Sequence, residues 1–217
     1  MLKLVLASNN AHKLAELSTL FAGLPLELQS QANWGVSEPD EPHATFVENA
    51  LVKARHTSAA TGLAAIADDS GLCVPALGGE PGVQSAVYAA DVGFSDGLSR
   101  EQRRQIQDAA NNQLLLQRLA DLPAAPETEY SARFVCTLVA VRHADDPEPL
   151  IATGRWTGVL RQQALGSGGF GYDPLLFMPE FGCTVAQMTA DMKNAHSHRA
   201  RAAAAMRELM ASAWWGH

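Results

Sequence analysis

The sequence is poor in cysteine and has no long apolar run. Its three cysteines, Cys73, Cys136 and Cys183, are far apart and odd in number, which fits neither a disulfide framework nor a zinc site built on paired CxxC motifs. No apolar run approaches the ~18 residues needed to span a bilayer, and the run that opens the chain is only a few residues long. We therefore expect free core thiols in a reducing compartment and a soluble, cytoplasmic protein without a membrane partner.

Positive charge is also in short supply. The 16 Lys and Arg residues are outnumbered by 23 Asp and Glu residues, so the formal net charge is −7. A field of this sign repels nucleic acid and anionic membranes, and we expect neither as a partner, while an anionic substrate must be held by local cations. With 47% hydrophobic and 18% charged residues, the composition is that of a globular protein rather than a disordered, collagen-like or coiled-coil chain. The length of 217 residues predicts one domain over residues 1–217, or two tightly joined lobes.

Apolar spacing predicts strands mixed with helices. Short apolar runs favour strands, and apolar residues at helical spacing between caps and breakers favour helices. The expected strands are residues 2–7, 63–67, 72–74, 134–141 and 150–156, and the expected helices are about 14–21, 46–60, 99–120, 189–195 and 198–213. Residues 78–97 are expected to be mostly loop. This order of elements predicts an α/β fold with a mixed sheet.

A polar turn follows the first expected strand and leads into the first expected helix. It contains Ser8, Asn9, Asn10, Ala11, His12 and Lys13. A helix N-terminus offers unpaired backbone N–H groups and a partial positive charge, so this turn could cradle a phosphate, with Lys13 as a point charge. The alternative is an ordinary asparagine cap beside a solvated lysine. Neither GxxxxGK[ST] nor GxGxxG, the common nucleotide motifs, is present.

Two aspartates end the second expected strand, in the segment Asp68, Asp69, Ser70 and Gly71. Consecutive side chains on an extended backbone point to opposite sides, so we expect only one aspartate to face a given site. A carboxylate there can hold Mg²⁺ or accept a proton from water, and Glu41 in the preceding acidic loop could supply another Mg²⁺ ligand. The alternatives are a polar turn at the aspartates and a solvated loop charge at Glu41.

Two later segments could also contact a ligand. Glycines between residues 166 and 171 allow the backbone to approach a ligand closely, while Phe170 offers a flat stacking face. A glycine-rich hairpin end is the alternative. Lys193 precedes Ser197, His198 and Arg199 at the start of the last expected helix, which is a favourable place for an anion. The alternative there is a surface-exposed helix start.

Lysine is scarce in this chain, which uses twelve arginines and four lysines. Three of the four, Lys13, Lys53 and Lys193, nevertheless lie beside the segments described above. The lysine ammonium is a compact point charge that suits phosphate oxygens, and a nucleoside triphosphate needs both such cations and Mg²⁺. The pattern therefore favours a triphosphate ligand.

With these residues the chain resembles the inosine/xanthosine triphosphate pyrophosphatase family, enzymes that hydrolyse non-standard purine nucleotides. The matching segments follow the family's order over nearly the whole chain: LASNNAHKLAEL, TFVENALVKAR, AIADDSGL, GGFGYDPLLF, and Lys193 with the closing SHR. The combination of ADDSGL, GFGYDP and SHR is specific, although each segment alone would be weak. The chain departs from the family's usual pattern at His12, Val87 and Ala200.

The resemblance implies a role for each matching residue. The triphosphate would be bound by Ser8, Asn9, Asn10, Ala11, His12 and Lys13, and the Mg²⁺ by Glu41 and Asp69, with Asp69 also the general base. Further substrate contacts would come from Ser70, Phe170, Gly171, Tyr172, Asp173, Lys193, His198 and Arg199. Lys53 and Asp68 would support these contacts.

The resemblance also implies a fold and a reaction. The fold would be an elongated α/β structure with helices flanking a mixed β-sheet, two lobes and an active cleft between them, usually as a homodimer. The reaction would be Mg²⁺-dependent attack of water on the α-phosphorus of ITP, dITP or XTP, giving the nucleoside monophosphate and pyrophosphate and keeping these nucleotides out of DNA and RNA. Two alternatives are a non-catalytic nucleotide-binding or sensor protein and a phosphatase acting at the γ-phosphorus. The candidate metal carboxylates and the lysines are all present, and a sensor would not need a general base, so the sequence favours an enzyme over a sensor.

Overall fold

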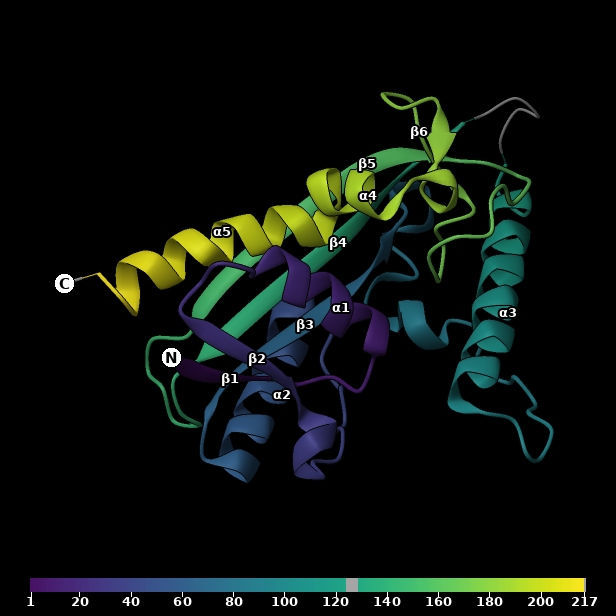
Figure 1. Cartoon of the computed structure of the whole chain (residues 1–217). Coiled ribbons are helices and arrows are strands. Elements are labelled where there is room, and N and C mark those ends of the chain that lie inside the picture. Colours follow the sequence, from purple (N-terminus) through teal and green to yellow (C-terminus); the bar gives the residue numbers. More distant parts are fainter. Residues whose placement is uncertain (124–128, 217) are drawn as a thin grey trace. The chain divides into compact units, whose positions relative to one another are not determined.

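A computed structural model describes residues 1–123 and 129–216 of the chain (Figure 1). Its strands are β1 (Leu2–Leu6), β2 (Leu26–Ser30), β3 (Ala64–Cys73), β4 (Tyr130–Val141), β5 (Leu150–Leu160), β6 (Leu176–Met178) and β7 (Cys183–Thr184). Its α-helices are α1 (Ala11–Leu20), α2 (Phe46–Thr61), α3 (Arg100–Ala120), α4 (Ala190–His196) and α5 (His198–Ala213). Short 3₁₀ helices lie at Gln31–Trp34, Pro75–Leu77, Gly82–Val87 and Val185–Gln187.

The strands form one mixed sheet in the order β2-β1-β3-β4-β5-β6-β7. β1 pairs in parallel with both β2 and β3, while β6 pairs antiparallel with both β5 and β7. Parallel and antiparallel pairs in one sheet, with helices between the strands in sequence, confirm the predicted α/β class. The predicted cleft between two lobes stays a prediction.

Local capping explains where the second helix begins and ends. The Thr45 side chain accepts a hydrogen bond from the Glu48 backbone N–H at 3.4 Å, which satisfies one of the unpaired donors at the start of α2. At the other end Gly62 adopts the left-handed conformation, with φ of 68°, and ends the helix. The predicted helix over residues 46–60 is therefore confirmed to within one residue of its end.

The prediction was wrong at the aspartates and at several strands. β3 runs without a break from Ala64 to Cys73, whereas the sequence predicted two short strands with a polar segment between them. β2, β6 and β7 were not predicted. Two of them, β6 and β7, have only three and two residues and therefore show no periodicity. β4 begins at Tyr130 and β5 ends at Leu160, beyond the expected limits.

The chain divides into two compact units. Residues 1–70, 135–155 and 194–217 form the first unit, and residues 71–134 and 156–193 form the second. β3, β4 and β5 contribute residues to both units. Within the described part of the chain, the first unit holds two buried hydrophobic clusters and the second unit holds one.

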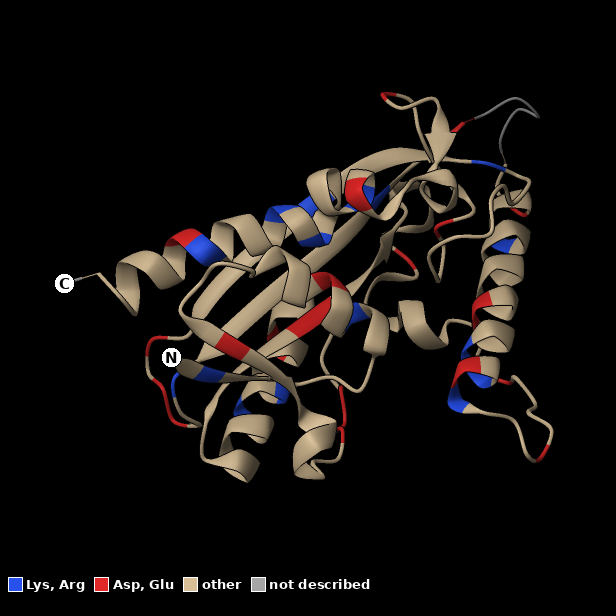
Figure 2. Cartoon of the chain, in the orientation of Figure 1, with Lys and Arg blue, Asp and Glu red and all other residues tan. Residues whose placement is uncertain are grey.

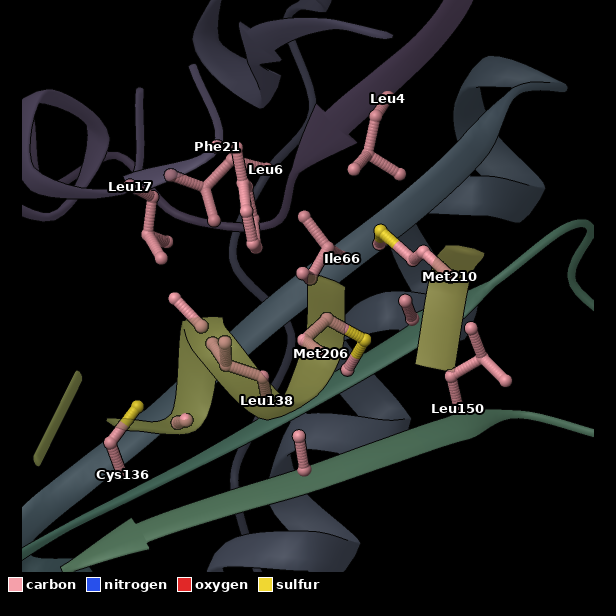
Figure 3. Packing of buried hydrophobic residues seen from close by; sticks show 14 of the residues in the cluster. Leu4, Leu6, Leu17, Phe21, Ile66, Cys136, Leu138, Leu150, Met206 and Met210 are labelled. Carbon is pink, nitrogen blue, oxygen red and sulfur yellow. The ribbon is translucent and has the colours of Figure 1, made fainter. Parts of the chain in front are cut away.

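In the first unit helices cover both faces of the sheet. Ile66 of β3 and Leu138 of β4 pack with Leu17 of α1 and Met206 of α5 in one buried cluster (Figure 3). Ala65 belongs to another buried cluster, which contains the alanines of α2. Because successive strand residues point to opposite faces, Ala64 and Ile66 of β3 face α1 and α5, and Ala65 and Ala67 face α2.

In the second unit α3 packs on the strands through Leu115 and Leu119, which share a buried cluster with Trp156 of β5 and Leu176 of β6. Trp156 is only 1% exposed, and its ring meets the ring of Phe181 edge to face at 6.3 Å. This cluster anchors both ends of the loop that joins β5 to β6. The glycine-rich segment lies in that loop.

No disulfide joins the three cysteines, all of which lie in the described part of the chain. Cys136 is buried, but Cys73 and Cys183 are half-buried, so the expectation of three core thiols holds for one of them. Within residues 1–123 and 129–216, no helix combines the length and the apolar character needed to cross a membrane. Figure 2 shows acidic and basic residues together on α3 and on α5.

Candidate active site

Asp68 and Asp69 lie next to each other in β3, and the strand turns their carboxylates to opposite faces of the sheet. Both residues are buried, with 1% and 6% of their surface exposed. Asp68 follows the alternation of Ile66 and faces α1 and α5, whereas Asp69 follows that of Ala65 and faces α2. The predicted divergence of the two side chains is confirmed, and the alternative of a polar turn is wrong.

Asp68 connects three elements of the first unit. Its Oδ1 accepts a hydrogen bond from Lys13 Nζ of α1 at 2.8 Å, and its Oδ2 accepts one from Arg199 Nε of α5 at 2.6 Å. The buried Cys136 Sγ of β4 also donates to Oδ2, at 3.5 Å. Burial acts to raise the pKa of the Asp68 carboxyl, but Arg199 and Lys13 outweigh burial and hold this pKa well below its usual range. Asp68 is therefore an ionised anchor between α1 and α5 rather than a proton acceptor.

Arg199 is almost completely buried, with 1% of its surface exposed. Besides Asp68, its guanidinium donates to Glu16 Oε2 of α1 and, at 3.1 Å, to Ser70 Oγ of β3. Burial acts to lower the pKa of Arg199, but the two carboxylates outweigh burial and raise it. The alternative of a surface-exposed helix start is therefore wrong for Arg199, and equally for His198, which is 6% exposed.

Asp69 faces a lysine on the other side of the sheet. Lys53 Nζ of α2 donates to Asp69 Oδ1 at 2.6 Å, to Glu41 Oε2 at 2.9 Å and to the Asp68 carbonyl oxygen at 3.3 Å. An ammonium group has three donors, so all three N–H groups of Lys53 point to protein oxygens. Burial acts to lower the pKa of Lys53, but Asp69 and Glu41 outweigh burial and raise it. The ammonium thus holds two carboxylates together, and Glu41 is not simply a solvated loop charge.

Asp69 is also set up to take a proton. Burial raises the pKa of its carboxyl to about 6, although Lys53 acts to lower it. Its second oxygen, Oδ2, is buried and has no hydrogen-bond partner among the described residues. A carboxylate with an unpaired oxygen and a raised pKa is suited to accept a proton from a bound water.

The same carboxylates fit a magnesium ion that is completed by substrate. Among the described residues, no group of three or more His, Cys, Asp or Glu side chains could hold a metal ion alone. Mg²⁺, however, is usually held by one or two carboxylates together with water and substrate phosphates. Glu41 and Asp69 meet at one ammonium, and the unpaired Asp69 Oδ2 offers a hard oxygen ligand. The donor set therefore fits this kind of site and not an all-protein cage.

The turn that precedes α1 is held largely by its own side chains. The Asn10 side chain caps the helix by accepting from the His12 and Lys13 backbone N–H groups at 3.0 and 3.4 Å, and Ser8 Oγ accepts from Asn10 N at 3.1 Å. Asn9 Oδ1 is buried without a hydrogen-bond partner in the described part of the chain. The asparagine cap is therefore confirmed. The other part of that alternative, a solvated lysine, is wrong, because the Lys13 side chain is only 16% exposed and its ammonium binds Asp68.

The second unit holds the glycine-rich loop around a buried aspartate. Asp173 Oδ2 accepts from the Phe170 backbone N–H at 3.0 Å and from Lys193 Nζ at 2.9 Å. Gly169 has φ of 72°, which disfavours any other residue, and a Cβ at this position would collide with Asp173 Oδ2, so a side chain here would displace the aspartate. Lys193 Nζ also lies 4.6 Å from the centre of the Phe170 ring. The loop does join an antiparallel strand pair, as in the hairpin alternative, but it also presents a partly exposed ring beside a lysine.

The predicted residues thus gather in two places. The first unit brings together Lys13, Glu41, Lys53, Asp68, Asp69, Ser70 and Arg199. The second unit brings together Phe170, Asp173 and Lys193. Tyr172 points into the core of the second unit, where its hydroxyl donates to the Ser85 carbonyl oxygen at 2.9 Å, so its side chain does not line a site.

The sequence reasoning missed Glu16 and Asn49. Glu16 holds the Arg199 guanidinium, and the buried Asn49 bonds both backbone polar groups of His43, which fixes the loop that carries Glu41. Helical spacing could have found both residues. Glu16 lies three positions after Lys13, and Asn49 lies four positions before Lys53, so each shares a helix face with a predicted lysine.

Comparison with known proteins identifies the family. The sequence model of the Ham1 family matches residues 4–209. The dITP/XTP pyrophosphatases of Leptothrix cholodnii and Methylibium petroleiphilum are 61% and 57% identical to this chain, and each match covers 98% of this chain and 99% of the relative. The solved structure of a HAM1 protein from Coxiella burnetii is 39% identical, with a TM-score of 0.81 over 96% of both chains. That of a dITP/XTP pyrophosphatase from Mycobacterium abscessus is 40% identical, with a TM-score of 0.68 over 94% of this chain and 98% of the other. The chain therefore belongs to the Ham1 family, which confirms the resemblance of its motifs.

Proposed function

We propose that this protein hydrolyses non-canonical purine nucleoside triphosphates, dITP and XTP among them, to the nucleoside monophosphate and pyrophosphate. This activity would keep such nucleotides out of DNA and RNA. Relatives of nearly equal length, at 57–61% identity, are named dITP/XTP pyrophosphatases. The ion pairs of Lys13, Lys53 and Asp69 support the proposal from the structure.

The observation that carries the proposal is the state of Asp69. Its pKa is raised to about 6, so near neutral pH the carboxylate is ionised and still basic enough to accept a proton. We propose that Asp69 orients the attacking water through its unpaired Oδ2 and takes the water's proton. Asp68 does not compete for this role, because Lys13 and Arg199 hold its pKa low.

Glu41 and Asp69 are the residues that would hold Mg²⁺. When bound, the ion would offset negative charge in the cluster and polarise the phosphate oxygens. In the ion pairs around the two aspartates, four carboxylates, Glu16, Glu41, Asp68 and Asp69, face three cations, Lys13, Lys53 and Arg199. A cluster with more negative than positive charge does not attract a triphosphate, and this supports a role for a divalent cation.

We assign the triphosphate to the turn from Ser8 to Lys13. Asn9 Oδ1 is a buried acceptor without a partner among the described residues, and Lys13 is a charged donor whose side chain retains some exposure. Lys53 has a different part in this proposal. Because its three N–H groups are used by Asp69, Glu41 and the Asp68 carbonyl, it would position the carboxylates rather than contact phosphate in this arrangement.

We assign the stacking contact with the purine to Phe170 in the second unit. The Phe170 ring would stack on the base, and Lys193 beside it would meet a phosphate or base oxygen. A pocket that donates to O6 and accepts from N1–H favours a 6-oxopurine, because adenine reverses both polarities and leaves buried groups unpaired. In the second unit the backbone around Phe170 and Asp173 is the candidate for these contacts, and in the first unit His198 and Arg199 are the candidates.

A substrate panel with product identification tests the proposal. The protein is incubated with dITP, XTP, dATP and dGTP, with and without Mg²⁺, and pyrophosphate and orthophosphate are measured separately. We expect pyrophosphate from dITP and XTP, much less from the ordinary nucleotides, and none without a divalent cation. Release of orthophosphate would instead indicate attack at the γ-phosphorus, and binding without any product would indicate a sensor.

A further inference from the structure

Helix α3 carries a row of polar side chains that the proposed reaction does not use. Arg104, Asp108 and Asn112 follow one another at intervals of four residues, so they lie on one face of the helix. All three are half-buried, although α3 is otherwise rich in exposed polar residues. The row is half-buried because it faces the glycine-rich loop of the same unit.

Two residues of this row hold the peptide groups of Gly171. The Gly171 backbone N–H donates to Asp108 Oδ2 at 2.8 Å, and Asn112 Nδ2 donates to the Gly171 carbonyl oxygen at 3.0 Å. Both backbone polar groups of Gly171 are thus satisfied by side chains of one helix. The bond to Asp108 is the stronger of the two, because its acceptor is a carboxylate oxygen rather than a backbone carbonyl.

The third residue of the row contacts the neighbouring aromatic ring. The Arg104 guanidinium carbon lies 4.8 Å from the centre of the Phe170 ring, and Arg104 Nε lies 3.9 Å from Asp108 Oδ2. A planar guanidinium at this distance is attracted to the ring face. Asp108 therefore acts on the loop twice, through the Gly171 peptide and through the orientation of Arg104.

The loop needs such support to keep one conformation. Gly169 and Gly171 both have positive φ, 72° and 63°, and glycines restrict the backbone less than any other residue. Phe170 lies between them. On one side its own N–H is held by Asp173, and on the other side Gly171 is held by α3, so the position of the ring depends on both attachments.

We propose that Asp108 is a positioning residue of the purine pocket, which holds the Gly171 peptide, together with Asn112 and Arg104, so that the Phe170 ring lies where a purine stacks on it. This inference rests on the proposed function, because it requires Phe170 to contact the base of the substrate. A ring held in place before binding loses less conformational freedom when the base arrives. Loss of Asp108 therefore affects KM more than kcat.

A double-mutant cycle with Phe170 tests this inference. Asp108→Ala is expected to lower kcat/KM for dITP about 10-fold, mainly through a higher KM, because one charged hydrogen bond is lost. In a Phe170→Ala background the same substitution is expected to cost less than ~2-fold, since the ring that it positions is absent. Asp108→Asn is expected to restore most of the activity, because its amide oxygen can still accept from Gly171 N–H. Gln113→Ala, an exposed position on the same helix, is the control and is expected to change nothing.

The outcomes separate the inference from the proposed function. Equal losses from Asp108→Ala in both backgrounds, with a lower thermal unfolding midpoint, would show a merely structural role and overturn the inference. An unchanged KM in the single variant would overturn it as well. If the wild-type protein releases no pyrophosphate from any purine triphosphate, the proposed function fails, and the inference fails with it. If the wild-type protein releases pyrophosphate but the kcat/KM or KM values of the Asp108 variants differ from those expected, the proposed function stands and only the inference about Asp108 is overturned.

Discussion

Asp68 and Asp69 are chemically identical and adjacent in sequence, yet their surroundings shift their pKa values in opposite directions. Both carboxylates are buried, and burial alone would raise both pKa values. Asp68 meets Lys13 and Arg199, which outweigh burial, whereas the pKa of Asp69 stays at about 6 despite Lys53. The alternation of one strand therefore places one aspartate between two cations and leaves the other with the raised pKa that its proposed role as general base requires.

This difference predicts opposite results for two matched substitutions. Asp69→Asn is expected to lower kcat by at least ~10²-fold, the usual scale for loss of a general base, while the protein stays folded because Glu41 still pairs with Lys53. Asp68→Asn is expected to lower the free energy of unfolding by ~3–5 kcal/mol, because it removes one partner from a buried ion pair. Steady-state kinetics and urea unfolding of both variants measure the two effects. Near wild-type kcat in Asp69→Asn would remove Asp69 from the role of base.

The raised pKa of Asp69 also predicts a pH dependence. The carboxylate accepts a proton only when it is ionised, so activity should be present above pH about 6 and fall as the pH is lowered through about 6. The profile of kcat/KM for dITP reports on the free enzyme and is the quantity to measure. A profile that stays flat down to pH 4.5 would mean that Asp69 keeps an ordinary carboxyl pKa. In the Asp69→Asn variant, the residual kcat/KM should no longer fall as the pH is lowered through about 6.

At the scale of elements, close approach of α5 to the sheet fixes the start of that helix. A Cβ added at Gly154 of β5 would collide with the His198 carbonyl oxygen and the Ala202 backbone N, neither of which can move aside without moving the helix. Gly154→Ala is therefore expected to lower the free energy of unfolding by ~1–3 kcal/mol or more, as overpacking does. Because α5 begins with His198 and Arg199, kcat/KM should fall as well.

A second glycine provides the control for this prediction. Gly93 does not have a positive φ, and an added Cβ there would meet nothing within 4 Å. Gly93→Ala is expected to leave both stability and kinetics unchanged, measured by urea unfolding and by turnover of dITP. If the two alanine variants unfold at the same denaturant concentration, the close packing of α5 on β5 does not limit stability.

Some helices and strands could be predicted from the sequence and others could not. Capping residues and apolar spacing located α2, α3 and α5 well, because those signals are local. The aspartates of β3 have the composition of a turn, and they remain in the strand because Lys13 and Lys53, distant in sequence, neutralise them. Local propensity carries no information about such partners.

The same limit applies to the site. Asp69 and the lysines could be singled out as candidates, because a specific motif and the scarcity of lysine mark them, whereas Glu41 was only a possible second Mg²⁺ ligand in an acidic loop until the family resemblance gave it a role. The roles of these residues stay predictions. Asp108 could not be assigned a task from the motifs, because it acts through Gly171, which folding brings to it from elsewhere in the chain. Arg199 was predicted to contact substrate, and this stays a prediction, although its guanidinium is held by Asp68, Glu16 and Ser70.

At the scale of the whole molecule, the family resemblance predicts a homodimer. We expect a solution mass of about twice the 23.1 kDa of the chain, measured by light scattering at micromolar concentration. We also expect a cytoplasmic location and a single domain over residues 1–217, as the sequence predicts. A mass equal to that of one chain at every concentration would contradict the dimer without affecting the proposed reaction.

Net charge is the other property of the whole molecule that bears on function. At −7 the chain repels a nucleoside triphosphate at long range, so binding must depend on the few cations at the site and on Mg²⁺. A general base near a metal could serve attack at more than one phosphorus atom. The phosphorus atom that water attacks therefore distinguishes the proposed reaction from its alternatives.

The position of attack is tested most directly by letting the protein hydrolyse dITP, in the presence of Mg²⁺, in water enriched in ¹⁸O. Attack on the α-phosphorus, with departure of pyrophosphate, places one ¹⁸O atom in the phosphate of dIMP and none in the pyrophosphate. Mass spectrometry of both products distinguishes this result from the alternatives. Attack on the α-phosphorus predicts label in dIMP alone, so label in pyrophosphate or in orthophosphate would show that water attacks another phosphorus atom.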